Sequence, residues 1–330
     1  MAAAPPPVVL LVGPILVGVC LNWLLWGILT VQVYYYTMFF KDSIKLKSLV
    51  YGLYIADSAQ TMIAMHSGFR ILCTHWGNIN AVISPGWTFC VVPIFSGIIS
   101  FPVQAFFAHR IWGLRKSYRS KTTTMIFNVV IVFILACAAM QAISSIITGG
   151  QLIVINDIQR FSELNTVISI WLAGSCVCDI TITLTMLVLL RKVGKKTQWH
   201  HTKSVINNLI QQTVETGLVT TVTALLELIF FLAEQNTSLH TTMAYMLAKL
   251  YTNTLMATLN SRIQNRATNE HAMALRSSGQ NSSGGGIDTR HNRSVLQPGH
   301  MTGPQTVIQV DKIHQLHRDE LSVRLVSFAS

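Results

Sequence analysis

The sequence predicts an all-α, polytopic membrane protein built as a bundle of seven transmembrane helices. Three observations lead to this fold class: long apolar runs, very few charged residues, and loops that alternate between basic and non-basic. Charged residues make up 11% of the 330 residues and the mean hydropathy is +0.46, whereas an ordinary soluble domain is about 25% charged. A chain with so little charge cannot keep a soluble surface hydrated, so the lipid bilayer is its expected solvent and partner.

Each predicted helix is an apolar run, and most runs reach or exceed the roughly 20 residues that a helix needs to cross a hydrocarbon core. Prolines inside the first and third runs predict kinks rather than breaks, because neighbouring helices can satisfy the freed carbonyl groups. The seventh run is marginal, since Lys249 lies within it. In chain order the runs are 8–33, 48–69, 88–108, 125–147, 167–190, 206–232 and 241–259.

The basic residues predict which way the bundle lies in the membrane. Every second loop is rich in Lys and Arg, whereas the loops between them hold only Arg70 and Arg160. Basic loops stay in the cytoplasm, so the N-terminus is expected outside and the C-terminus inside, with the plasma membrane as the default location. This placement accounts for the net charge of +11 without any nucleic-acid partner. The basic loops contain Lys41, Lys45, Lys47, Arg110, Arg115, Lys116, Arg119, Lys121, Arg191, Lys192, Lys195, Lys196 and Lys203.

The composition changes abruptly after the last run, which divides the chain into a transmembrane domain (1–262) and a disordered cytoplasmic tail (263–330). The stretch 277–293 is too polar and too rich in glycine to bury a core. Apolar residues return from Thr306 onward. A loosely structured end is the favoured interpretation of that final segment, and a short amphipathic helix or a docking peptide for a cytoplasmic partner are the alternatives.

Four ionisable residues are expected near the middle of the membrane. Measured from the nearest basic boundary at about 1.5 Å per residue, Asp57, Asp179, Glu215 and Lys249 all lie roughly 15–20 Å deep. A charge at this depth costs about 2.5–3.5 kcal/mol on insertion scales, so each needs an explanation. Lys249 is the only fixed cation in the layer, and we expect it to pair with one or two of the carboxylates.

Two asparagines extend this polar layer along the seventh run. Asn253 follows Lys249 by one helical turn and Asn260 by three, which predicts one polar stripe facing the bundle interior. A functional interpretation is a ligand pocket, an ion path or a switch built on the layer. The alternative is a structural polar clamp that fixes how the helices pack.

The cysteines and histidines indicate little chemistry. Cys73 and Cys90 both fall near the expected outer face and form a candidate disulfide, whereas the other four cysteines fit as small packing residues inside the runs. No repeated HxxxH or HxxxD pattern is present, so neither a metal site nor a cofactor is predicted.

Several segments are similar to a known group of proteins. They are GPILVGVCLNWLLWGILTVQVYYY, followed by KDS, then FPVQAFFAHRIW, and a C-terminal part that runs from DITITLTMLVLL through SVINNLIQQTVETGLVT to LAKLYTNTLMATLNSR. The chain resembles, over about Gly13–Arg262, fungal membrane proteins that share a C-terminal domain of unknown function 6534. Serines are expected in that family where Thr252 and Thr254 stand, and Glu215 is not expected at its place. The resemblance implies a seven-helix membrane protein and no established activity.

A non-enzymatic, receptor-like protein is the leading functional interpretation, with a small ligand or ion left unidentified. The predicted orientation is that of a G-protein-coupled receptor, but no acidic residue precedes Arg110 and no NPxxY ends the seventh run. The alternative is an ion- or proton-coupled transporter or channel that uses the Asp/Lys layer, although no internal repeat supports it. A retinal protein, suggested by Lys249, is disfavoured because the third run contains no carboxylate.

Overall fold

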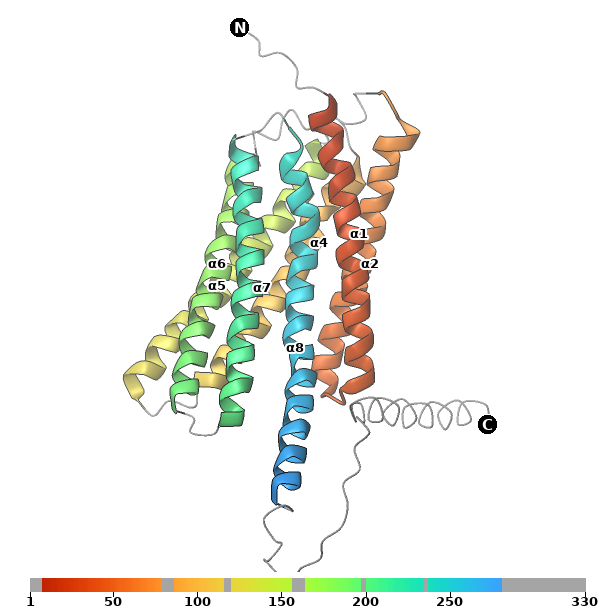
Figure 1. Ribbon diagram of the computed structural model, residues 1–330. Helices are drawn as coiled ribbons and strands as arrows, with labels where there is room; N and C mark the ends of the chain where they lie inside the picture. The colour runs from red at the N-terminus through yellow and green to blue at the C-terminus, as the bar shows by residue number, and fades with distance from the viewer. Residues whose placement is uncertain are drawn as a thin grey trace, which may run out of the picture. The chain divides into compact units, whose positions relative to one another are not determined.

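The computed structural model describes residues 8–78, 86–115, 120–155, 164–196, 200–233 and 237–280. Within these ranges the chain forms seven α-helices, one short π-helical segment and no β-strand (Figure 1). The helices are α1 (Val8–Phe39), α2 (Ile44–Phe69), α4 (Trp87–Arg115), α5 (Lys121–Ile155), α6 (Asn165–Lys196), α7 (His200–Ala233) and α8 (Leu239–Gln280), with the π-helical segment η1 (Arg70–Thr74) after α2.

Each predicted apolar run lies inside one helix, but the helices extend beyond the runs. Backbone hydrogen bonds continue a helix into polar flanking residues, whereas hydropathy marks only its apolar part. α8 shows the largest difference, because it does not end at residue 262 with the apolar pattern but continues to Gln280. A second compact unit begins at Ser278, and residues 281–330 of the predicted tail lie outside the described residues.

Prolines are accommodated inside two of the helices. α1 continues through Pro14, and α4 continues through Pro93 and Pro102. Proline has no N–H, so Pro14 cannot donate to the carbonyl of Leu10 one turn earlier. That carbonyl accepts a bond from the backbone N–H of Ser238 instead, at 3.2 Å. A neighbouring part of the chain thus satisfies the freed group, as a membrane interior requires.

Five described helices are long and apolar enough to cross a membrane: α1, α4, α5, α6 and α7. The chain is therefore a multi-pass integral membrane protein by length and composition. The prediction of seven spans is met only in part, because α2 and α8 do not reach this level of hydropathy. The reason is their buried polar content, since α2 carries Asp57 and Gln60 and α8 carries Lys249 and Asn253.

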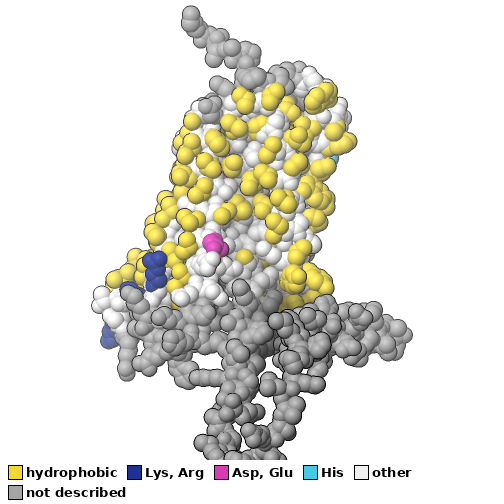
Figure 2. Space-filling model, viewed as in Figure 1, with side chains coloured by type: hydrophobic (Ala, Val, Ile, Leu, Met, Phe, Trp, Pro, Cys, Tyr) yellow, Lys and Arg dark blue, Asp and Glu magenta, His cyan; other side chains and the backbone are white. Residues whose placement is uncertain are grey.

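The bundle buries polar side chains together with its core and exposes large apolar ones. A single hydrophobic cluster draws on all seven helices; its members include Leu29, Leu53, Ile99, Ile134, Leu189, Ala224 and Leu255. Many exposed positions carry Leu, Ile, Val or Phe, and Figure 2 shows them covering the visible helical face, with Lys and Arg near its lower end. A surface of this kind is suited to lipid contact.

Small residues allow neighbouring helices to approach closely, as is usual in membrane bundles. A Cβ atom on Gly149 of α5 would lie 2.9 Å from the carbonyl oxygen of Cys90 in α4. A Cβ atom on Gly18 of α1 would lie 3.1 Å from the Cα atom of Thr242 in α8. Glycine at these two positions lets backbone pack against backbone.

Candidate functional site

A fully buried ion pair joins α2 to α8. The Lys249 ammonium nitrogen lies 2.8 Å from Oδ1 of Asp57, and neither side chain has any exposed surface. The same nitrogen donates to the backbone carbonyl of Asp57 at 2.9 Å and to Oε1 of Gln60 at 2.8 Å. An ammonium group has three N–H donors, so all three can be used. The lysine is therefore neutralised and solvated entirely by α2.

The burial of this pair determines what it can do. Removing one partner of a buried pair leaves an uncompensated charge, which typically costs about 3–5 kcal/mol. The pair is thus a strong constraint on how α2 and α8 meet. These are also the two helices whose hydropathy alone does not mark them as spans. Protein atoms enclose both side chains, as the clamp interpretation expects.

Asp179 belongs to a separate polar cluster, centred on α6. Its Oδ2 accepts a bond from the Tyr251 hydroxyl at 2.9 Å, and its Oδ1 accepts one from Nε2 of Gln104 at 3.2 Å. Gln141 of α5 donates in turn to Oε1 of Gln104. Four helices therefore meet at this network, and Lys249 pairs with Asp57 rather than with Asp179.

A small cavity of about 30 Å³ lies beside Asp179, and its lining includes Tyr251, Gln104 and Thr220. This is about the volume of one water molecule in the liquid. The cavity beside Asp179 therefore has room for at least one water molecule.

Glu215 lies outside both buried clusters. Its side chain is exposed on α7 and accepts a hydrogen bond from Gln211 one turn earlier, at 2.8 Å. Glu215 has about the same depth along its helix as the other three charged residues. It lies on the exposed face of α7, however, and not on the face that meets them. The predicted layer is therefore two clusters, and Glu215 is in neither.

α8 is joined to α1 by hydrogen bonds that repeat at a constant offset of 228 residues. The donors on α8 are Thr242, Asn253 and Asn260, and the acceptors are the α1 carbonyls of Pro14 at 2.7 Å, Leu25 at 3.2 Å and Gln32 at 2.9 Å. The bond from Ser238 to Leu10 has the same offset. A constant offset means that the two helices run parallel and in register, as they do side by side in Figure 1.

The two asparagine donors of these bonds could be predicted from the sequence, but their acceptors could not. The spacing of Asn253 and Asn260 indicates a shared face, but the acceptors are backbone carbonyls, which every residue has. In addition, Asn22 of α1 donates to the carbonyl of Tyr245 at 2.8 Å. Asn253 also donates to the carbonyl of Lys249 in its own helix, at 2.7 Å.

The candidate disulfide is not formed in the structure. Cys73 is an exposed free thiol in η1, whereas Cys90 is a buried free thiol near the start of α4. The Cys90 thiol lies 3.4 Å from the carbonyl oxygen of Gly86 and donates to it. In the described part of the chain, no group of three His, Cys, Asp or Glu side chains is placed to hold a metal ion.

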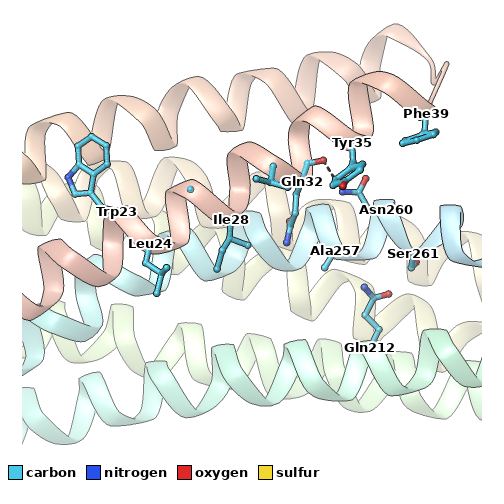
Figure 3. A pocket seen from close by; sticks show the side chains of 12 residues that line it. Trp23, Leu24, Ile28, Gln32, Tyr35, Phe39, Gln212, Ala257, Asn260 and Ser261 are labelled. Atoms are coloured by element: carbon cyan, nitrogen blue, oxygen red, sulfur yellow. Dashed lines mark hydrogen bonds between the residues drawn. The ribbon is translucent and has the colours of Figure 1, made fainter. Parts of the chain in front are cut away.

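A groove of about 950 Å³ lies between α1, α7 and α8 (Figure 3). Its lining is mainly apolar and includes Trp23 and Ile28 of α1 and Ala257 of α8. In Figure 3 the side chains of Gln32 and Gln212 extend toward it from α1 and α7. The groove is open at the surface and separate from the buried ion pair.

The fold and its buried polar clusters define an α-helical, multi-pass membrane protein of unknown function. Residues 175–264 match the model of a family described as "Family of unknown function (DUF6534)". The matched segment contains Asp179, Lys249 and the α8 asparagines, whereas Asp57 lies outside it. The chain matches no curated protein and no solved structure.

Proposed function

We propose that the chain is a receptor-like, non-enzymatic membrane protein with seven transmembrane helices, its N-terminus outside and its C-terminus in the cytoplasm. The plasma membrane is its proposed location. Basic residues such as Lys41, Arg115 and Arg191 come at the ends of alternate helices, which supports this orientation. We call the end of the bundle that carries them the basic end.

The bonds between α1 and α8 support α8 as a membrane span. They extend along α1 from Leu10 to Gln32, which is about 33 Å at the rise of an α-helix and so close to the thickness of a hydrocarbon core. α1 is apolar enough to cross the membrane, and α8 runs beside it in register. Lys249 lies on α8 between Thr242 and Asn253, which both bond to α1. Because Asp57 pairs with Lys249, α2 is held at the same level as these two helices.

The single observation that carries the receptor-like interpretation is the closed state of the Asp57–Lys249 pair. A transporter or channel that used these charges would need water or an ion to reach them. Both side chains are fully buried, and every N–H of the ammonium group has a protein partner. A pair of this kind fits a protein that holds its helices together, rather than one that passes ions along them.

An ion- or proton-coupled transporter is the second candidate, and the Asp179 cluster is the observation that favours it. That carboxylate lies beside a small cavity and within a chain of hydrogen bonds through Gln104 to Gln141. A buried carboxylate is the kind of group that carries protons in pumps and transporters, although the glutamines in this chain of bonds are not titratable.

Proton flux separates the two candidates. The purified chain is reconstituted into liposomes loaded with a pH-sensitive dye, and a pH gradient is applied with a permeant counter-ion. The receptor-like proposal expects no flux above that of protein-free liposomes. Flux that Asp179→Asn abolishes would overturn it in favour of transport. In nanodiscs with a purified heterotrimeric G protein, nucleotide exchange above the level of empty nanodiscs would support receptor coupling directly.

A further inference from the structure

A second small cavity lies between the helices, at the end opposite to the basic end. It has a volume of about 50 Å³, and residues of α4, α5, α6, α7 and α8 line it. The helices contribute the parts that lie farthest from the basic end, such as the final turns of α7 with Glu227 and the first turn of α8 with His240. None of the residues discussed above as the ion pair or the Asp179 cluster lines this space.

Glu227 is the unusual residue of this cavity. Its side chain is 3% exposed, and its Oε2 has no hydrogen-bond partner among the described residues. Nδ1 of His240, in the same lining, also lacks a partner there. No Lys or Arg in the described part of the chain forms an ion pair with Glu227. A buried carboxylate is costly in its charged form when no cation or donor meets it, and a ligand that supplies both would remove that cost.

The remaining walls are suited to a cation. Trp171 of α6, Phe231 of α7 and Tyr245 of α8 all line the cavity, and the face of an aromatic ring attracts an ammonium group. The His240 ring meets Phe231 edge to face, with 5.6 Å between ring centroids, which holds both rings in place. A carboxylate combined with aromatic walls is the combination that recognises protonated amines.

The size of the cavity limits the ligand. A water molecule takes up about 30 Å³ in the liquid, so a space of about 50 Å³ admits one small group. Ammonium and methylammonium are among the smallest organic or inorganic cations and fit a space of this kind.

We propose that this cavity binds a small protonated amine of ammonium or methylammonium size, with Glu227 as its counter-ion. The amine donates its N–H groups to the Glu227 carboxylate and to Nδ1 of His240, and it places its positive charge against the rings of Trp171 and Phe231. The amine would be the ligand of the receptor-like protein. The amine site rests on the receptor-like proposal only for the effect that binding would have on the protein. Binding itself is measurable independently.

The test uses the purified full-length chain in nanodiscs and radiolabelled methylammonium at neutral pH. We expect saturable binding that ammonium chloride displaces and that sodium chloride and tetramethylammonium chloride at equal concentration do not. Glu227→Gln removes the counter-ion and should weaken binding at least about tenfold, because a charge-assisted bond is lost. Glu215→Gln, an exposed glutamate on the same helix, is the matched control and should bind as the unaltered chain does.

A second variant keeps the proposal testable if Glu227→Gln does not fold. Ala244→Val adds volume to the cavity lining without removing the charge, and it should also reduce methylammonium binding at least about tenfold by excluding the ligand. Absence of saturable binding in the unaltered chain would overturn the proposal, as would equal displacement by sodium or unchanged binding in Glu227→Gln. None of these results bears on proton flux, so the failure of this proposal and that of the receptor-like proposal are distinguishable.

Discussion

The backbone N–H of Ser238 donates to the carbonyl of Leu10, the group that Pro14 leaves without its partner in α1. This bond begins a series that continues at the same offset to Asn260. Each donor on α8 therefore meets the α1 residue at its own level. The side chains of Thr242, Asn253 and Asn260 bond to backbone carbonyls of α1, so these three bonds do not depend on which side chains α1 carries at the acceptor positions.

We expect Gly18→Ala to destabilise the protein. The added Cβ would lie 2.8 Å from Cδ2 of Tyr245 and 3.1 Å from the Cα atom of Thr242, and a backbone atom cannot move away cheaply. The cost should be about 1–3 kcal/mol, as for other overpacked sites. The thermal unfolding midpoint in detergent measures it.

Gly27→Ala is the matched control on the same helix. No atom lies within 4 Å of a Cβ atom built at Gly27, so this change should raise stability by about 0.5–1 kcal/mol through helix propensity. If both variants shift the midpoint in the same direction, the close approach of α1 to α8 at Gly18 does not exist.

Asn260→Leu should lower stability by about 0.6 kcal/mol and by no more than about 1.7, the measured range for hydrogen bonds between membrane helices. The change removes the bond to the carbonyl of Gln32. Thr254→Val serves as the control, because among the described residues the Thr254 hydroxyl bonds to the carbonyl of Leu250 within its own helix. An equal loss in both variants would argue against a contact specific to α1.

Arg262→Lys should cost less than about 1 kcal/mol, as is usual for exposed ion pairs. Arg262 donates to both oxygens of Asp42, at 3.1 and 2.5 Å, and lies over the ring of Phe40. Lysine keeps the positive charge but lacks the planar guanidinium group that donates to both carboxylate oxygens at once. The Arg262 side chain is 38% exposed, so high salt should shrink the difference between the two proteins.

Arg191→Lys is the control for this substitution, because Arg191 is also an exposed arginine at the basic end. It should leave the unfolding midpoint unchanged at both low and high salt. A salt-independent loss in Arg262→Lys would mean that packing on Phe40, not the pair with Asp42, is what lysine fails to replace.

The helices could be predicted from the sequence because apolar length is a property of each segment by itself. The two helices with buried charged residues, α2 and α8, were harder to predict as spans. α2 and α8 hide their charges in the bundle, so hydropathy understates how well they fit there. The proposal that both cross the membrane is supported by Asp57 and Lys249 lying opposite each other, which neither segment shows by itself.

The partners of the charged residues could be predicted only in part. Distance from a basic boundary gives the depth of a residue, but the face of the helix decides what it meets. Asp57 and Lys249 share both depth and direction. Asp179 faces Gln104 and Tyr251 instead, and Glu215 faces outward. Glu227 could not be singled out from the sequence, because its isolation appears only when residues of five helices are brought around it.

The most direct test of the clamp is a double-mutant cycle between Lys249 and Asp57, read from thermal unfolding of the purified chain. Lys249→Met alone should cost about 3–5 kcal/mol, because it leaves the Asp57 carboxylate buried without a cation. Adding Asp57→Asn should recover more than half of that loss, whereas adding Asp179→Asn should recover none. If the losses of Lys249→Met and Asp57→Asn simply add, the two residues are not coupled and the clamp between α2 and α8 is contradicted.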